Sequence, residues 1–515
     1  MVFQLIKNVY AVLGVRLRRD IRSEFELGLI KKTSLLPWED FENHEFQMKM
    51  ETVNRRGSEA YQRLSVELIE SMTGSIMYIA IYVAVVMRLS VVIGLVFLGA
   101  SILYYIIGFI FGNKVYKMIR ETNKASRKLN YLFRAGEQKQ GHQDILVNRL
   151  VGYISNKWDM LNTSYKDKAV KSENRIKLYI LIPNLFFVLI AGWLMYEVIG
   201  EIENGNQSIG YFGLIIATII NYKNTMYTLS VRIQWNKRDI NIYRDCIDIY
   251  KRASEMNNNE KTLPNDFIIT FEDVTYKYIQ GEVKALNRFN ISITSQETVA
   301  IVGVNGSGKT TFVNLLMELT KRYDGRIKVN DYNIDDELGI IRNSASCIYQ
   351  DFSEYQVTIR DNIRLGDLKR DIEDKEVWTI LEKVGLKAFV EELPDDINTM
   401  LGQINKGTDL SKGQWQRLAV ARLLANKEAK IWILDEPTAY LDPIAEIEMY
   451  EFIYSLKEDR SVIFISHRLG FAKQADRILV FKDGAVIEEG THKELLDNMN
   501  GEYSRMYLKQ KKWYE

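Results

Sequence analysis

The chain has few of the residues that build covalent or metal cross-links. Its 515 residues include only two cysteines, Cys246 and Cys347, and neither lies in a CxxC or histidine-rich pattern. This argues against a disulfide framework or a zinc site and fits a reducing compartment with two incidental thiols. An excess of basic charge is also missing, because the formal net charge is +1. Nucleic-acid binders need a basic field, so the sequence predicts no nucleic-acid partner.

The N-terminus lacks the order of a secretory signal. In MVFQLIKNVYAVLGVRLRRDIR the apolar part comes first, the charges follow, and no small-residue cleavage site appears. With Lys7 inside it, the apolar part is also shorter than the roughly 20 residues that a full membrane span needs.

Long apolar runs, by contrast, are present in the first half of the chain. Residues 71–112 are interrupted by charge only at Arg88. One helix of that length would measure about 60 Å, twice the hydrocarbon thickness of a bilayer, so we predict two spans joined by a tight turn. Soluble buried helices are the alternative, but several runs of suitable length with consistent flanks favour membrane spans. The four predicted spans are 71–88, 90–112, 178–199 and 208–229.

Charge asymmetry orients these predicted spans. The long segment 113–176 is rich in lysine and arginine, whereas the short loop 201–208 is acidic. By the positive-inside rule, the basic segment is cytoplasmic and the acidic loop lies outside. The fourth run carries Asn221 and Lys223. These two residues either line a pathway through the membrane, or Lys223 merely reaches the interface from near a helix end.

The composition becomes polar from residue 257 onward. Short β-branched runs then alternate with helical patterns, which predicts a mainly parallel sheet covered on both faces. The predicted fold class is thus an N-terminal α-helical transmembrane bundle followed by a C-terminal α/β P-loop domain. The predicted boundaries are 1–256 for the transmembrane domain, 257–266 for a linker and 267–515 for the α/β domain.

The motif GVNGSGKT, at residues 303–310, is the most specific local signal. It follows an apolar strand pattern and opens a helix pattern, as a phosphate-binding loop requires. Its glycines let backbone amides converge on a phosphate, and the helix N-terminus adds partial positive charge. We expect Lys309 to reach the β- and γ-phosphates of a nucleoside triphosphate, and Thr310 to supply an oxygen to Mg²⁺.

Polar residues at the ends of other apolar runs are further candidates for catalysis. Asp435 and Glu436 end the run KIWILDEP; the first is expected to hold the water shell of the metal and the second to act as a general base. His467 ends SVIFISH and is a candidate donor to the γ-phosphate, although a lone histidine is usually structural. Gln350 also follows an apolar run and could ligate Mg²⁺ or position water, although an isolated glutamine carries little specificity.

In this order and spacing, the motifs resemble the nucleotide-binding domain of ATP-binding-cassette (ABC) transporters, from about Phe267 to the C-terminus. GVNGSGKT resembles the Walker A loop, IWILDE resembles Walker B with its catalytic glutamate, and Gln350 resembles the Q-loop glutamine. Asp442 resembles the D-loop aspartate, His467 the switch histidine, and Tyr278 the aromatic residue that stacks on adenine. The resemblance implies an ATP site made of Tyr278, Gly303, Asn305, Gly306, Ser307, Gly308, Lys309, Thr310 and Thr311. It places Mg²⁺ at Thr310, Gln350 and, through water, Asp435.

The stretch LSKGQ resembles the family signature and comprises Leu410, Ser411, Lys412, Gly413 and Gln414. The resemblance implies that Ser411 and Gly413 face the γ-phosphate of the ATP held by a second chain. A single chain would then hold two half-sites, so the expected working unit is a homodimer, or a heterodimer with another half-transporter. Lys412 departs from the glycine that is usual in the family. It either points to solvent or adds positive charge near the ATP held by the second chain.

Spans that precede a cassette in the same chain resemble the exporter branch of the family. The resemblance implies an ATPase that exports a peptide, lipid or drug-like substrate across a bacterial cell membrane, with several spans in lipid and the ATP-binding domain in the cytoplasm. Residues 38–53 and 137–150 resemble the coupling helices of that branch. Such exporters have six spans, so we expect the first span and most of the second to be missing. A truncated, transport-incompetent membrane ATPase or regulatory remnant is the alternative function.

Overall fold

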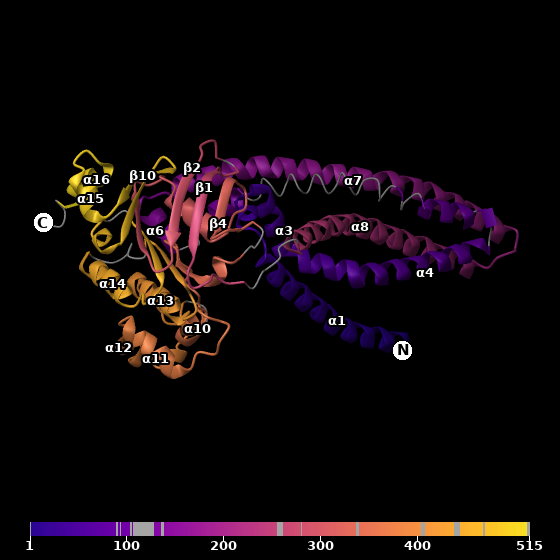
Figure 1. Cartoon of the computed structure of the whole chain (residues 1–515). Helices are drawn as coiled ribbons and strands as arrows, with labels where there is room; N and C mark the ends of the chain where they lie inside the picture. Colours follow the sequence, from indigo (N-terminus) through magenta and orange to yellow (C-terminus); the bar gives the residue numbers. More distant parts are fainter. Residues whose placement is uncertain are drawn as a thin grey trace. The chain divides into compact units, whose positions relative to one another are not determined.

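Helices form the first part of the chain and an α/β fold forms the second (Figure 1). The computed structural model describes residues 2–511 apart from 89–90, 93, 103–105, 107–127, 135–138, 255–260, 280, 336–338, 403–406, 437–442 and 467–468. The chain divides into two units: unit 1 comprises residues 1–35 and 45–254, and unit 2 comprises 36–44 and 255–515. The predicted order, a helical region followed by an α/β domain, is confirmed.

Unit 1 is built of helices, several of them long. Tyr222, Leu194 and Val86 are fully buried where α4, α7 and α8 pack together. With 53 and 46 residues, α7 and α8 measure about 80 and 70 Å at ~1.5 Å per residue. The described elements are α1 (Val2–Thr33), α3 (His44–Gln62), the π-helical segment η1 (Arg63–Glu67), α4 (Leu68–Met87), α6 (Lys139–Val147), α7 (Val151–Glu203) and α8 (Ile209–Ser254).

The predicted membrane spans fall on these helices. Residues 71–88 coincide with most of α4, 178–199 lie within α7, and 208–229 coincide with the start of α8. Of the predicted span 90–112, residues 91–92, 94–102 and 106 are described and are helical, and the rest lie outside the described residues. In the part of the chain that the structure describes, no helix combines the length and the apolar content that crossing a membrane requires. The four spans therefore stay a prediction.

Unit 2 contains two β-sheets. The first has four strands in the antiparallel order β2-β1-β4-β5, and the second has six in the order β10-β9-β3-β8-β7-β6. In the second sheet β9, β3, β8, β7 and β6 run parallel, and β10 pairs antiparallel with β9. The strands are β1 (Ile268–Tyr276), β2 (Leu286–Thr294), β3 (Thr298–Gly303), β4 (Tyr323–Val329), β5 (Tyr332–Asn333), β6 (Ala345–Ile348), β7 (Ile431–Asp435), β8 (Ser461–Ile465), β9 (Arg477–Lys482) and β10 (Ala485–Gly490).

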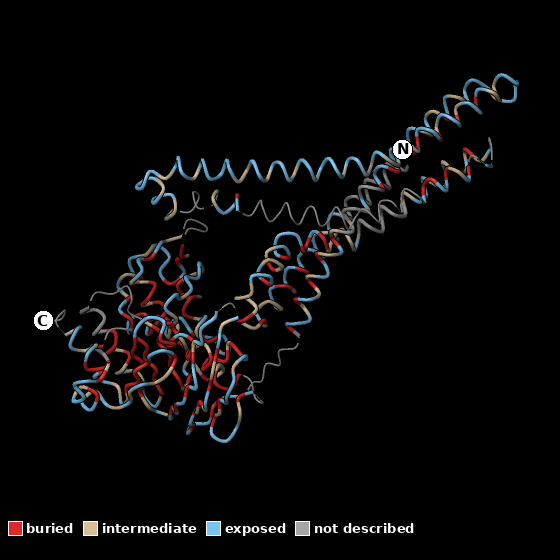
Figure 2. The backbone as a smooth tube through the Cα atoms, turned by 90° about the horizontal axis from the view of Figure 1, so that it is seen from above, coloured by how far each residue is buried: buried red, intermediate tan, exposed pale blue. Residues whose placement is uncertain are grey.

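The central strands of the six-stranded sheet are buried on both faces. Every residue of β3, β7 and β8 is buried, which explains their continuous apolar sequences. Alternate side chains enter two separate cores, so Val299 lies in one and Ala300 in the other. Buried stretches are densest in this unit, although the helices of unit 1 also carry some (Figure 2).

Helices cover the sheets of unit 2. Those that follow β6 along the chain, α10 to α13, gather at one end of the unit (Figure 1). The helical segments are α9 (Lys309–Leu316), η2 (Arg342–Ser344), α10 (Ile359–Arg364), α11 (Asp374–Lys383), α12 (Lys387–Glu391), η3 (Asp396–Asn398), α13 (Lys412–Ala425), α14 (Pro443–Ser455), η5 (Phe471–Gln474), α15 (His492–Asp497) and α16 (Glu502–Lys511).

The loop between β3 and α9 depends on glycine. Gly306 and Gly308 have φ angles of +80° and +105°, which side chains with a Cβ atom rarely adopt. A Cβ at Gly308 would also lie 2.7 Å from the carbonyl oxygen of Ala285, whereas a Cβ at Gly306 would meet nothing within 4 Å. Gly308 is therefore required both for its conformation and for the close approach of a neighbouring backbone.

A short helix from the N-terminal half of the chain belongs to unit 2. This helix, α2 (Trp38–Glu42), ends at Asn43 in an extended conformation, so residues 38–53 are split between the two units rather than forming one element. Glu39 is only 7% exposed. Its carboxylate accepts hydrogen bonds from the Thr320 hydroxyl, the Lys321 amide at 2.7 Å and the Arg322 amide at 3.0 Å. Glu39 thus fixes α2 to the turn that follows α9.

Replacing Glu39 with alanine is expected to release this turn. The amides of Lys321 and Arg322 would lose their acceptor, at a cost of about 1–3 kcal/mol, which raises the equilibrium constant for local opening by roughly 5- to 150-fold. Hydrogen–deuterium exchange of the purified full chain, followed in the peptide that contains residues 320–322, measures this change.

Glu51→Ala is the matched control, because Glu51 forms an exposed ion pair with Arg55 at 2.9 Å. Such pairs contribute little, so exchange at 320–322 should stay as in the unmodified chain. Equal exchange in the Glu39 and Glu51 variants would contradict the role assigned to Glu39.

Substituting alanine at Gly308 is expected to destabilise unit 2 more than the same substitution at Gly306. Both positions impose a left-handed φ, which costs an ordinary residue about 1–2 kcal/mol. Only Gly308→Ala adds a steric clash with the backbone. Chemical unfolding of the two purified variants compares their losses, and equal losses would show that the close approach at Gly308 is unimportant.

Candidate active site

Most of the polar residues predicted from the sequence meet at one edge of the six-stranded sheet. The strands β3, β8, β7 and β6 are neighbours and run parallel, so their carboxyl ends share that edge. The loop 303–308 follows β3, Gln350 follows β6, and Asp435 and Glu436 lie at the end of β7. The sheet topology therefore brings together motifs that are more than a hundred residues apart.

Lys309, the first residue of α9, folds back over the loop. Its ammonium group donates to the carbonyl oxygens of Gly303 at 2.9 Å and Val304 at 3.1 Å. The side chain is buried, and this burial lowers the pKa of Lys309. The Ser307 hydroxyl is also buried and has no hydrogen-bond partner among the described residues. The loop thus presents a desolvated cation and an unsatisfied hydroxyl, both suited to an anion.

Thr310 and Asp435 lie next to each other across the sheet edge. The Thr310 hydroxyl donates to the Asp435 carboxylate over 3.4 Å. Asp435 is only 3% exposed. Burial, together with the neighbouring charge of Glu436, raises the pKa of Asp435 to about 6. A carboxylate that is costly to ionise in this position would be stabilised by a nearby cation.

Gln350 and Glu436 are in direct contact. The amide nitrogen of Gln350 donates to the Glu436 carboxylate at 2.9 Å. Glu436 has a φ angle of +47°, which is unusual for a glutamate, and its own amide is bonded to Ile465 of β8 at 2.9 Å. The chain therefore turns sharply at Glu436, and its carboxylate lies against Gln350, two residues after the end of β6.

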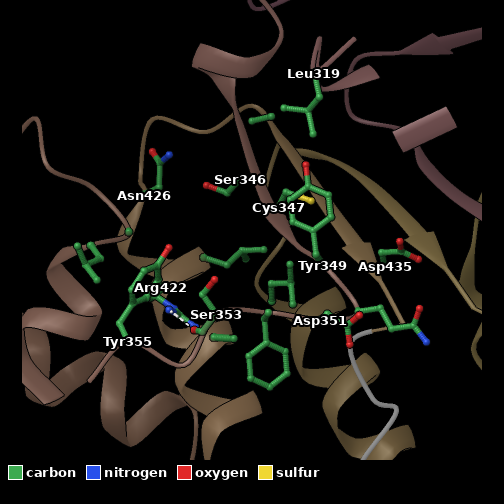
Figure 3. Close-up of a pocket in the computed structure, with 18 of the residues that line it drawn as sticks. Leu319, Ser346, Cys347, Tyr349, Asp351, Ser353, Tyr355, Arg422, Asn426 and Asp435 are labelled. Carbon is green, nitrogen blue, oxygen red and sulfur yellow. Dashed lines mark hydrogen bonds between the residues drawn. The ribbon is translucent and has the colours of Figure 1, made fainter. Parts of the chain in front are cut away.

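A cavity of about 880 Å³ lies beside this edge. It is lined by residues of the sheet edge, including Asp435, and by residues of α13 and the loop after Gln350 (Figure 3). Cys347 also lines it, and burial raises the pKa of this thiol to about 12, so it stays protonated at neutral pH. Both cysteines are free.

Tyr278 contacts α9, the helix that follows the loop. Its hydroxyl lies 2.9 Å from the Thr311 hydroxyl, and its ring makes an edge contact with Tyr276. Asn305, by contrast, is exposed. The predicted adenine-stacking residue is thus attached to α9 rather than isolated on the surface.

The signature-like stretch forms the start of α13. Ser411 is the N-cap: its hydroxyl accepts from the Gln414 amide at 3.2 Å, and the Gln414 side chain accepts from the Ser411 amide at 2.9 Å. This reciprocal pair is a capping box. Leu410 is buried beneath it, and Lys412 and Gly413 are the first two residues of the helix. Gln414, predicted as a contact to the second chain's ATP, therefore has a local role in starting α13.

Two predicted residues, Asp442 and His467, lie outside the described residues. Others were missed by the sequence reasoning. Glu318, with a φ of +54°, is buried and accepts from the Ile341 amide at 2.8 Å, so it holds the segment that leads into β6. Arg422 of α13 contacts the loop after Gln350. Neither glutamates nor arginines in polar stretches carry a pattern that would have identified these contacts.

Comparison with known sequences gives a consistent picture. Residues 286–439 match the family described as ABC transporter. The chain is 28% identical to the subtilin transport ATP-binding protein SpaT of Bacillus subtilis, covering 96% of this chain and 81% of that protein. It is 27% identical to the nisin transport ATP-binding protein NisT of Lactococcus lactis subsp. lactis, covering 96% and 84%. These alignments do not support the expectation that the first span and most of the second are missing, nor the truncated alternative.

Comparison with solved structures agrees on the fold. A bacterial Atm1-family ABC exporter with ATP bound superposes with a TM-score of 0.80 at 20% identity, covering 98% of this chain and 88% of that chain. An ATP-dependent lipid A-core flippase of Desulfotalea psychrophila is 32% identical over 62% of this chain and 56% of its own length. The chain is therefore similar in sequence to ABC transporters, with the family match lying inside unit 2, and it shares the fold of a solved exporter of that kind.

Proposed function

We propose that the chain binds ATP at the loop 303–308 and hydrolyses it with Glu436, as one half of a dimeric exporter. The observation that carries the proposal is the bond between Gln350 and Glu436 beside the Lys309 loop. It sets a general-base candidate next to a site suited to phosphate. The remaining ATP contacts are proposed at Tyr278, Asn305, Ser307 and Thr311.

In this proposal each side chain at the edge has a separate task. Lys309 binds the β- and γ-phosphates when ATP displaces its contacts with the carbonyl oxygens of Gly303 and Val304. Glu436 accepts the proton of the attacking water, and Gln350 keeps its carboxylate aimed at the site. The unusual φ of Glu436 fixes that direction through the backbone.

The residues at this edge also fit Mg²⁺. Thr310 supplies a hydroxyl oxygen, Gln350 an amide oxygen, and Asp435 a buried carboxylate whose raised pKa indicates that no protein cation compensates it fully. Mg²⁺ is commonly held by one or two protein oxygens together with substrate phosphates and water. When bound, it would neutralise charge on the phosphates.

A second chain completes the site in this proposal. Ser411 is the N-cap and Gly413 lies in the first turn of α13, where the helix dipole places partial positive charge. They are suited to the γ-phosphate of ATP held by the second chain's Lys309. A homodimer with two such sites is the simplest assembly, and a heterodimer with another half-transporter has the same geometry.

The transported substrate is proposed at the level of its class. Relatives are named for transport of subtilin and nisin and for flipping of lipid A-core, which supports export of a peptide, lipid or drug-like compound. The chain would work in a bacterial cell membrane with unit 2 in the cytoplasm. The apolar runs on α4, α7 and α8 are the proposed spans.

Glu436→Gln tests the catalytic assignment. Glutamine has nearly the same shape but cannot accept the proton of water at neutral pH, so ATP binding should persist while hydrolysis falls by roughly a hundredfold or more. ATP binding and phosphate release by the purified full chain measure the two properties separately.

Glu458→Gln is a suitable control, because Glu458 lies on an exposed turn and pairs with Arg460 at 3.0 Å. Its hydrolysis should match that of the unmodified chain. Normal turnover in Glu436→Gln would refute the assignment of the base, and loss of ATP binding would show that Glu436 instead supports the fold of the site.

A further inference from the structure

Lys412, which replaces the glycine usual in the family signature, is paired within its own chain. Its ammonium group lies 2.6 Å from the carboxylate of Glu354, and the two side chains are 57% and 35% exposed. Glu354 lies four residues after Gln350, in the loop that leads to α10. The ion pair therefore connects the start of α13 with the loop that begins at Gln350.

A second contact holds the same loop on α13. Arg422 lies in the last turn of α13. It donates two hydrogen bonds to the carbonyl oxygen of Ser353, each at 3.0 Å (Figure 3). Its guanidinium group also stacks on the ring of Tyr355 at 5.2 Å. Two successive residues, Ser353 and Glu354, are thus attached to α13 at two points.

The loop is also fixed at its far end. Asn362 of α10 is fully buried, and its side-chain amide donates to the carbonyl oxygen of Tyr355 at 3.0 Å. Only residues 351 and 352 separate Gln350 from the attached part of the loop. A displacement of Gln350 would therefore reach Ser353 and Glu354, which are attached to α13, after only two intervening residues.

We infer that Lys412 and Glu354 are a positioning pair that joins the two half-sites of one chain: the Gln350 loop of its own ATP site and the signature that meets the second chain's ATP. The inference rests on the proposed dimeric ATPase. In this arrangement, ATP at one site moves the Gln350 loop, and Lys412 transmits that movement to Ser411 and Gly413. Binding at the two sites of the dimer becomes coupled.

The charges explain why a lysine is tolerated at this position. A cation in the first turn of a helix opposes the helix dipole. The carboxylate of Glu354, at 2.6 Å, offsets that unfavourable interaction and keeps the lysine on its own chain. Arg422 does not replace this contact, because it lies in the last turn of α13, away from the signature. The pair is therefore the direct link between the Gln350 loop and the start of α13.

A double-mutant cycle on the full-length chain tests the pair. The variants are Lys412→Met, Glu354→Gln and the double substitution, and the readouts are the Hill coefficient of steady-state ATP hydrolysis and the thermal unfolding temperature. The unmodified chain should show a Hill coefficient above 1. Because exposed ion pairs are weak, each single variant should lose roughly two- to fivefold in coupling between the sites, and the double variant should lose no more than either single one.

Two further variants serve as controls. Lys412→Arg keeps the charge opposite Glu354 and should behave like the unmodified chain. Lys387→Met removes another surface lysine, paired with Glu382 at 3.4 Å on α12, and should leave the Hill coefficient unchanged. A role confined to stability would change the unfolding temperature of the Lys412 and Glu354 variants without changing the Hill coefficient, and this would overturn the inference.

Other outcomes separate the inference from the proposed function. Lys412→Met could weaken ATP binding by the same factor in the unmodified chain and in the Glu354→Gln variant. In that case Lys412 acts directly on the second chain's ATP, and the pair does not link the Gln350 loop to the start of α13. If the unmodified chain hydrolyses ATP with a Hill coefficient of 1, or if all variants match it, the sites are not coupled through this pair and the ATPase assignment still stands. Absence of hydrolysis that depends on Glu436 would overturn the proposed function itself.

Discussion

The strands β3, β7 and β8 have no face in contact with water, so polar groups that follow them can lie only where the strands end. This constraint gathers Lys309, Asp435 and Glu436 at one edge of the sheet. Burial then gives each group its chemistry, because it lowers the pKa of Lys309 and raises that of Asp435. The site is therefore a consequence of the sheet: charges that would be ordinary in water become costly there, and a bound phosphate or metal ion would offset that cost.

Two buried carboxylates accept hydrogen bonds from backbone amides in the segments that flank the site. Glu39 accepts from the turn after α9, and Glu318, at the end of that same helix, accepts from the segment before β6. Each replaces water as the partner of several buried donors, which would be expensive to leave unpaired. The segment after the helix that begins at Lys309 is thus attached to α2 and to the segment that leads into β6.

The sequence predicted the α/β fold well, and it pointed to candidate residues at the ends of strands, because both depend on local signals. Apolar runs fix the strands, glycines fix the loop at 303–308, and the order of parallel strands then brings Gln350 and Glu436 together. The contacts of Glu39, Arg422 and Lys412 were not predictable in this way. Their partners are up to 283 residues away or lie in irregular loops, and a charged residue on a polar surface has the same local pattern whether or not it has a partner.

The start of α13 is capped by residues of its own chain, and it still has the capacity to bind an anion. The Ser411 hydroxyl uses a lone pair to accept from the Gln414 amide, but a hydroxyl also has a proton to donate. The N-terminus of α13 also carries the partial positive charge of the helix dipole. Lys412 cannot accept the hydroxyl proton, because it is a donor and is paired with Glu354. In the proposed dimer, an anion held by a second chain would accept from this hydroxyl and would be favoured by the start of the helix.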